Sequence, residues 1–163
     1  MTTPLTDQSR NPLVAVLFVS IACLASALYL QESKDWFPCA LCVVQRYAYL
    51  GTAFFALMAL MVQASPVRKG VVALAVLSGL AGLGAALYHV WVLSNPGVSC
   101  GVDPLQLKLN ALPWTGWWPM MFEADGLCTA EYPPFLGLDL PAWSAIGFAV
   151  QLMLLIKAVF VKK

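Results

Sequence analysis

Four long apolar segments constrain the fold of this chain more than any other feature. They cover residues 13–30, 43–62, 71–93 and 142–161. Each has about the 17–25 residues that a helix needs to cross a bilayer. The chain is 61% hydrophobic and only 10% charged, whereas a soluble domain carries about a quarter charged residues. We therefore expect an all-α integral membrane protein, in which residues 1–163 form a single membrane domain built as a four-transmembrane-helix bundle.

Lysine and arginine residues indicate how this bundle is oriented. Lys34 and Lys108 lie in the loops 31–42 and 94–141. The chain ends and the connection between the second and third segments hold a larger group: Arg10, Arg68, Lys69, Lys157, Lys162 and Lys163. By the positive-inside rule, both termini should be cytoplasmic and both loops should face outward, into the periplasm of a bacterial cell.

Four of the five cysteines lie on the side of the membrane that the charge pattern assigns to the outward loops. Cys23 lies within the first apolar segment, and the other four lie in or beside the outward loops: Cys39, Cys42, Cys100 and Cys128. Disulfides persist in the oxidising periplasm. Of the three possible pairings, the natural one is local, Cys39 with Cys42 and Cys100 with Cys128. The second bridge is either a structural staple or, because glycine, proline and small polar residues surround it, a labile bridge accessible to a partner thiolate.

The Cys-x-x-Cys pair has three possible roles. Haem attachment requires a histidine directly after the second cysteine, where this chain has Val43. A structural zinc site needs four ligands, and His89 is the only histidine, although a four-cysteine site is a minor alternative. A redox pair fits best, because Pro38 suits the first turn of a helix and the dipole at a helix N-terminus stabilises a thiolate.

Two further residues bring polarity close to the Cys-x-x-Cys pair. Arg46 follows Cys42 by four positions and Cys39 by seven, so the three share one helix face. An arginine inside a membrane is a functional-site candidate, although this one could instead snorkel to the headgroups. His89 should lie at a similar depth, either in an interfacial aromatic belt or beside Arg46 as a second donor to a quinone carbonyl.

The combination of these residues resembles a known family, the bacterial inner-membrane disulfide bond formation protein B, a quinone-linked oxidase of the periplasmic thiol oxidase DsbA. The second apolar segment opens with PCALCVVQR, and YHV occurs near the end of the third. A cysteine stands early in the second outer loop, and ADGLC and FLGLDLPAW precede the fourth segment. The resemblance covers nearly the whole chain.

The resemblance implies roles for the four loop cysteines. Cys100 and Cys128 would form the bridge that oxidises DsbA, with Cys100 taking the mixed disulfide. Cys39 would receive electrons from Cys128, and Cys42 would be the thiolate beside ubiquinone or menaquinone.

The resemblance also implies the surroundings of this route. Arg46 would support the quinone and His89 would lie near it, while Gln45 stands where some relatives have an acidic residue. The implied function is that of an inner-membrane thiol:quinone oxidoreductase supporting disulfide bond formation. Its expected partners are a DsbA-like thioredoxin-fold protein, the membrane quinone pool and the lipid bilayer. We expect no nucleic-acid partner and no metal.

Two other functions remain open at this point. A vitamin K epoxide reductase-like enzyme is also a four-helix quinone-linked protein, but its helix-borne Cys-x-x-Cys follows the loop cysteines, the reverse of the order here. A non-catalytic membrane scaffold or metal-binding protein would purify with a stoichiometric metal or would function without Cys39.

Overall fold

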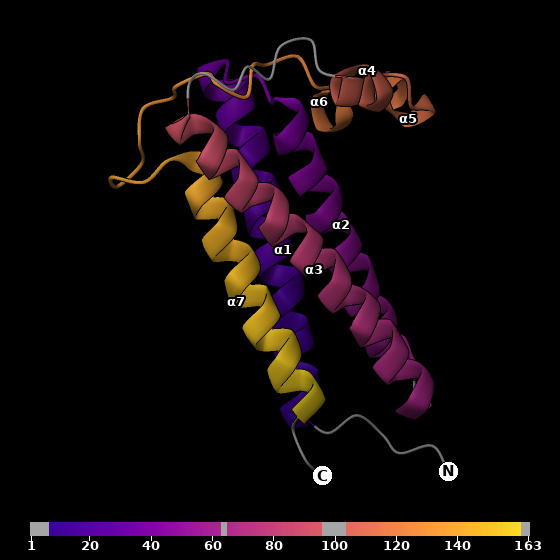
Figure 1. The fold of residues 1–163 in the computed structure, drawn as a ribbon. Helices are drawn as coiled ribbons and strands as arrows, with labels where there is room; N and C mark the ends of the chain where they lie inside the picture. The colour runs from indigo at the N-terminus through magenta and orange to yellow at the C-terminus, as the bar shows by residue number, and fades with distance from the viewer. Residues whose placement is uncertain (1–6, 63–64, 96–103, 161–163) are drawn as a thin grey trace.

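The computed structural model describes residues 7–62, 65–95 and 104–160 (Figure 1). It contains four long helices: α1 (Asp7–Lys34), α2 (Ala40–Met61), α3 (Ser65–Ser94) and α7 (Leu140–Phe160). Each is long and apolar enough to cross a membrane. Within the described residues, the only β-structure is an isolated bridge between Phe135 and Leu138. The expected all-α fold with four candidate spans is therefore confirmed.

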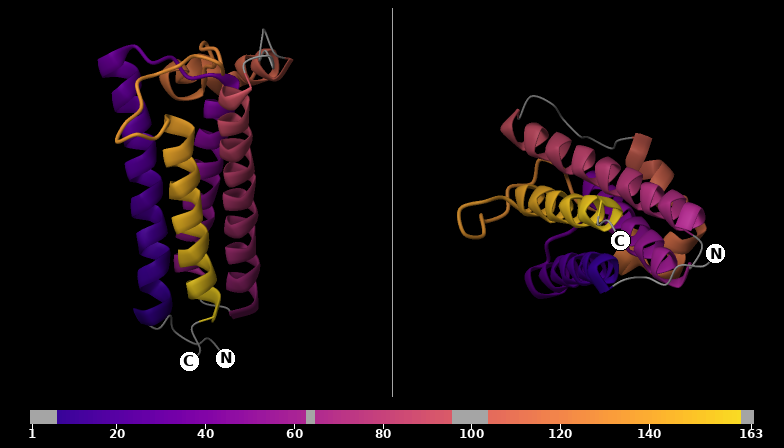
Figure 2. Two further views of the ribbon diagram at one scale, coloured as in Figure 1. Left: turned by 60° about the vertical axis from the view of Figure 1, so that its left-hand side comes forward. Right: turned by 90° about the horizontal axis from the view of Figure 1, so that it is seen from below.

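The four long helices pack side by side in a closed arrangement. Helix α2 packs against α1 and α3, and α7 packs against the same two helices (Figure 2). The start of α1 and the end of α7 lie at one end of the bundle (Figure 1). The opposite end carries the connection between α1 and α2 and the described part of the connection between α3 and α7. The latter includes three short helices: α4 (Pro104–Asn110), α5 (Pro113–Trp117) and α6 (Pro119–Phe122). Loops that are distant in sequence therefore meet at one end.

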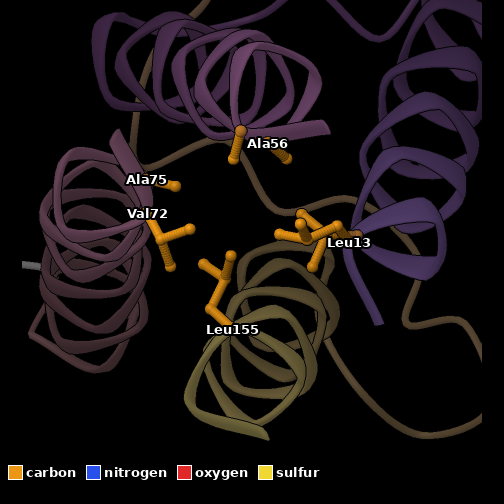
Figure 3. Packing of buried hydrophobic residues seen from close by; sticks show 7 residues of the cluster. Leu13, Ala56, Val72, Ala75 and Leu155 are labelled. Carbon is orange, nitrogen blue, oxygen red and sulfur yellow. The ribbon is translucent and has the colours of Figure 1, made fainter. Parts of the chain in front are cut away.

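Apolar side chains fill the inside of the bundle and also cover its outside. Inside, Leu13, Ala56, Val72, Ala75 and Leu155 meet from all four long helices (Figure 3). Outside, large apolar side chains are exposed on every long helix: Phe18, Ile21, Phe54, Leu77, Leu80, Met153 and Ile156. An exposed apolar surface of this extent is unfavourable in water and suits contact with lipid.

Small residues allow α3 to approach its neighbours closely, as the SGLAGLGAA pattern indicates. A Cβ atom added at Gly82 would collide with the ring of Phe148 on α7 and would lie 2.7 Å from Cβ of Ala48 on α2. In the same region, the rings of Tyr49 and Phe148 stack with centroids 4.0 Å apart. This tight contact fixes the upper halves of α2 and α3, which carry the polar residues described below.

The three short helices are anchored to α2. The phenol oxygen of Tyr47 accepts a hydrogen bond from Nε1 of Trp114 at 2.6 Å. The Tyr47 ring also stacks on Phe122, with centroids 5.3 Å apart. Asn110 exchanges two hydrogen bonds with the backbone of Ala124, each 2.9 Å long. The segment leading to Cys128 is thus held against the start of α2.

Candidate active site

Cys39 and Cys42 stand at the N-terminus of α2. Cys39 is the N-cap, with an extended backbone, and its carbonyl accepts the first helical hydrogen bond from the amide of Val43 at 3.1 Å. The Sγ atoms of the two cysteines are 3.4 Å apart, with the Cys39 thiol donating to Cys42. Pro38 precedes the N-cap, so the prediction that it lies in the first helical turn is wrong. Its carbonyl accepts hydrogen bonds from the second loop instead.

The carbonyl of Pro38 is hydrogen-bonded to the second loop. It accepts hydrogen bonds from the backbone amides of Asp125 and Gly126, both 3.0 Å long. A Cβ atom on residue 126 would collide with the carbonyl oxygen of Phe37, so only glycine fits this close approach.

A second contact joins the same two loops. The hydroxyl of Tyr132 donates to the carbonyl of Phe37 at 3.0 Å. The ring of Tyr132 stacks on Trp36, with centroids 4.8 Å apart. Cys128 lies between Gly126 and Tyr132 in the sequence, so these contacts hold it beside the start of α2.

Cys128 packs against Cys39 in a small buried cluster that also includes Leu41 and Val92. Cys39 is 2% exposed and Cys128 is 3% exposed, whereas Cys42 is only partly buried. Hydrogen bonding with the Cys128 and Cys42 thiols, reinforced by burial, raises the pKa of the Cys39 thiol. The loop therefore folds the sulfur of Cys128 inward, away from a partner's thiolate, and the accessibility of the Cys100–Cys128 bridge stays a prediction. Cys100 lies outside the described residues.

His89 reaches into this sulfur cluster from α3. Its Nδ1 atom lies 3.8 Å from Sγ of Cys42, and its Nε2 atom lies 3.8 Å from Sγ of Cys39. Nε2 is also 3.2 Å from the carbonyl oxygen of Cys128. His89 is 5% exposed, whereas its neighbours Tyr88 and Trp91 are each 49% exposed and stack on each other. His89 therefore belongs to the sulfur cluster, whereas Tyr88 and Trp91 face outward.

Arg46 is buried one helical turn beyond Cys42. Its Nη1 atom donates to the carbonyls of Met120 and Met121, at 2.9 and 3.3 Å, and Nη2 donates to Oε1 of Gln31 at 2.8 Å. The side chain is 5% exposed, enclosed by α1 and α6, so it does not snorkel to the headgroups. All three acceptors are neutral oxygens, so the positive charge is solvated by dipoles and remains uncompensated by these partners.

Gln45 adds a buried polar group beside Arg46. Its side chain is 5% exposed, and its Nε2 atom has no hydrogen-bond partner among the described residues. A buried donor without a partner is costly, which is typical of positions where a ligand or water completes the bonding.

The structure brings Cys39, Cys42, Cys128 and His89 together and places Arg46 one turn away. Sequence reasoning found these residues but missed the ones that position them: Gln31, Trp36, Gly126 and Tyr132. Gly126 had one usable signal, the Asp-Gly pair in ADGLC, which is typical of a turn.

The chain is similar over most of its length to proteins of one family. Residues 9–158 match the family described as "Disulfide bond formation protein DsbB". The chain belongs to the DsbB family. It is 43% identical over 155 residues to disulfide bond formation protein B of Herminiimonas arsenicoxydans, covering 95% of this chain and 98% of that protein. The corresponding protein of Cupriavidus necator is 48% identical over 138 residues, covering 85% of this chain and 84% of that protein.

Family membership confirms the resemblance seen in the sequence. The chain is therefore a multi-pass membrane protein of a family that acts in disulfide bond formation. A relative named disulfide bond formation protein B 1, from Pseudomonas entomophila, is 41% identical over 151 residues and covers 91% of this chain and 88% of its own length. Each of these matches covers most of both chains, and the family match over residues 9–158 includes all the described cysteines.

We predict that Gly126→Ala slows the exchange that joins Cys39 to Cys128. The added methyl group collides with the Phe37 carbonyl and forces the loop away from Pro38. Overpacking of this kind costs about 1–3 kcal/mol, so the Cys39–Cys128 disulfide should form on the order of 10-fold more slowly. The rate is measured with Cys39 and Cys42 both present, after mixing with reduced DsbA in the absence of quinone, by acid quenching and mass spectrometry of the disulfide-linked peptides.

Gly116→Ala is the matched control for this prediction. It makes the same change in the same loop, but nothing lies within 4 Å of the added Cβ atom. Its rate should equal that of the parent protein. Equal rates for both alanine variants would show that the contact at Pro38 does not position Cys128.

Proposed function

We propose that this protein is a thiol:quinone oxidoreductase that re-oxidises a periplasmic DsbA-type thiol oxidase and passes two electrons to a membrane quinone. The observation that carries the proposal is the cluster of Cys39, Cys42, Cys128 and His89 at one end of a bundle of four candidate membrane spans. Such a cluster supplies sulfurs from a loop and from a membrane helix at one place, as the reaction requires.

The proposed sulfur route conserves electrons at each step. The dithiol of DsbA reduces the Cys100–Cys128 bridge and becomes a disulfide. The Cys128 thiolate then attacks Sγ of Cys39 in the Cys39–Cys42 disulfide, which forms a Cys39–Cys128 bond and releases Cys42 as a thiolate. The contact between Cys39 and Cys128 supports this step, because the attacking and attacked residues are already packed together.

The surroundings of Cys42 favour its thiolate. A carbonyl oxygen only accepts hydrogen bonds, so the contact with Cys128 O requires that Nε2 of His89 carries the proton. Nδ1 then presents a lone pair to Cys42 and can take the thiol proton. The Cys39 thiol also donates to Cys42, which stabilises a negative sulfur.

The residues around Cys42 fit a quinone head group. When bound, the quinone supplies a two-electron acceptor that leaves as a quinol. Cys42 is only partly buried, so its sulfur can meet a ligand from the lipid phase. Arg46 supplies a positive charge with neutral partners, and Gln45 supplies a donor without a partner. His89 contributes the acceptor for the thiol proton and a further polar contact.

The proposed location follows from the reaction and from the charge pattern. We place the protein in a bacterial inner membrane, with both termini in the cytoplasm and the loops 31–42 and 94–141 in the periplasm. The structure supports this placement insofar as the described parts of both loops lie at the same end of the bundle (Figure 1). The periplasm is oxidising and contains the thioredoxin-fold partner that the route requires.

The experiment that tests this function uses the purified full chain, reduced DsbA and a soluble ubiquinone or menaquinone analogue. We expect one quinone reduced for each DsbA oxidised, as followed by quinone absorbance and thiol titration. A DsbA that stays reduced with either quinone would contradict the proposal. The family match favours this function over a vitamin K epoxide reductase-like enzyme, and the same assay separates it from a non-catalytic scaffold.

A further inference from the structure

The reduced form of the sulfur cluster has the geometry of a metal site. Sγ of Cys39, Sγ of Cys42 and a ring nitrogen of His89 all lie within 4.8 Å of one another. The closest approaches are 3.4 Å between the sulfurs and 3.8 Å from each sulfur to the imidazole. The sequence alone led us to expect no metal, because a structural zinc site needs four ligands and His89 is the only histidine.

The sulfur–sulfur distance and the distance from Sγ of Cys42 to Nδ1 of His89 are close to the edges of a tetrahedron around zinc. Zn²⁺ lies about 2.3 Å from cysteine sulfur and about 2.0–2.1 Å from histidine nitrogen. A tetrahedral site therefore has sulfurs about 3.8 Å apart and a nitrogen about 3.5 Å from each sulfur. The 3.4 Å between the sulfurs and the 3.8 Å from Sγ of Cys42 to Nδ1 of His89 are within a few tenths of an ångström of these edges. A single ring nitrogen makes only one of the two 3.8 Å contacts, and the three ligand atoms lie within 4.8 Å of one another, so the imidazole and Cys39 must approach each other when an ion binds.

The surroundings of His89 are those of a metal ligand. Metal-binding histidines usually donate their second ring N–H to a carboxylate or a backbone carbonyl, which fixes the tautomer and orients the ring. Here Nε2 donates to the carbonyl of Cys128 at 3.2 Å, and Nδ1 keeps its lone pair toward Cys42. Cys42 is only partly buried, which gives an ion a way in.

We propose that the dithiol form of this protein binds one Zn²⁺, or a similar thiophilic divalent cation, through Cys39, Cys42 and His89. A water molecule takes the fourth position. Each thiol releases one proton on binding, and no electrons are transferred. The disulfide form does not bind, because a disulfide offers no thiolate. Soft sulfur donors with one imidazole select zinc over magnesium or calcium.

Zinc binding should inhibit electron transfer. Only this consequence rests on the proposed function. A cation that binds only the dithiol stabilises it against oxidation. At a free Zn²⁺ concentration 100 times its Kd, the dithiol is favoured about 100-fold, which raises the reduction potential of the Cys39–Cys42 pair by about 59 mV. Zinc would thereby hold electrons at Cys42 and slow their passage to the acceptor.

The test measures Zn²⁺ binding directly, by competition with a chromogenic chelator, on the full chain in detergent without oxygen, DsbA or quinone. We expect one Zn²⁺ per reduced protein and none per oxidised protein. Co²⁺ in place of Zn²⁺ should show the visible absorption of tetrahedral sulfur coordination. Cys42→Ser and His89→Ala should each weaken binding at least 100-fold, whereas Cys23→Ser, which removes a thiol outside the site, should leave the Kd unchanged.

Three outcomes would overturn the proposal: no binding to the reduced protein, equal binding to the oxidised protein, or binding that survives both Cys42→Ser and His89→Ala. The oxidised protein needs no substitution, so it remains a valid control if a variant fails to fold. Because the binding assay contains no electron acceptor, loss of zinc binding with quinone reduction intact refutes only this inference. Zinc binding without quinone reduction refutes only the proposed function.

Discussion

Cys42→Ser should abolish quinone reduction while leaving a single round of DsbA oxidation. The Cys100–Cys128 bridge of the proposed route does not depend on Cys42, so one equivalent of DsbA dithiol is still oxidised. Without Cys42, however, no Cys39–Cys42 disulfide accepts these electrons, and no thiolate faces the lipid phase. Steady-state turnover should fall at least 1,000-fold, since the residue that makes the contact with the acceptor is removed.

Measuring DsbA oxidation and quinone reduction separately distinguishes the proposed route from its rivals. Stopped-flow mixing with reduced DsbA should show a burst of one equivalent followed by no further oxidation, and quinone absorbance should not change. Cys23→Ser is the matched control, because Cys23 packs beside Tyr49 and Phe148 within the bundle and away from the sulfur cluster. Undiminished quinone reduction by Cys42→Ser would refute the role of Cys42 as electron donor.

The properties of this fold that depend on composition and local spacing were predictable from the sequence. Four apolar segments are sufficient to predict four helices, because each must satisfy its own backbone hydrogen bonds in lipid. The spacing of Cys39, Cys42 and Arg46 predicts a shared helix face. The prediction of Pro38 within the first turn was wrong, because the carbonyl of Pro38 bonds to another loop and Cys39 takes the N-cap instead.

The contacts that join the loops were not predictable from local patterns. Arg46 donates to the backbone carbonyls of Met120 and Met121, and every residue type carries such a carbonyl. The amides of Asp125 and Gly126 likewise bind a backbone oxygen. Contacts of this kind leave no residue-type signature in a single sequence. The position of His89 also depends on the packing of α3 against α2, which hydropathy does not determine.

Arg46→Ala should raise the KM for quinone and change the kcat by a smaller factor. Hydrogen bonds that involve a charged group contribute about 1.5–3 kcal/mol, so the expected rise is on the order of 10- to 100-fold. The physical reason is that Arg46 is a buried cation whose partners are all neutral, so its charge is available to a quinone carbonyl and to the Cys42 thiolate. Steady-state kinetics over a range of quinone concentrations measures both parameters.

The hydrogen bonds of Arg46 allow a structural role to be distinguished from an electrostatic one. Gln31→Ala removes the acceptor of Nη2 without removing the charge or the two hydrogen bonds of Nη1, so its KM should change by less than about threefold, as expected for the loss of one part-buried hydrogen bond. Arg46→Lys keeps the charge but cannot bond to Met120, Met121 and Gln31 together, and should fall between the wild type and Arg46→Ala. If Gln31→Ala raised the KM as much as Arg46→Ala, Arg46 would act by holding α1 against α2, and its charge would have no part in quinone binding.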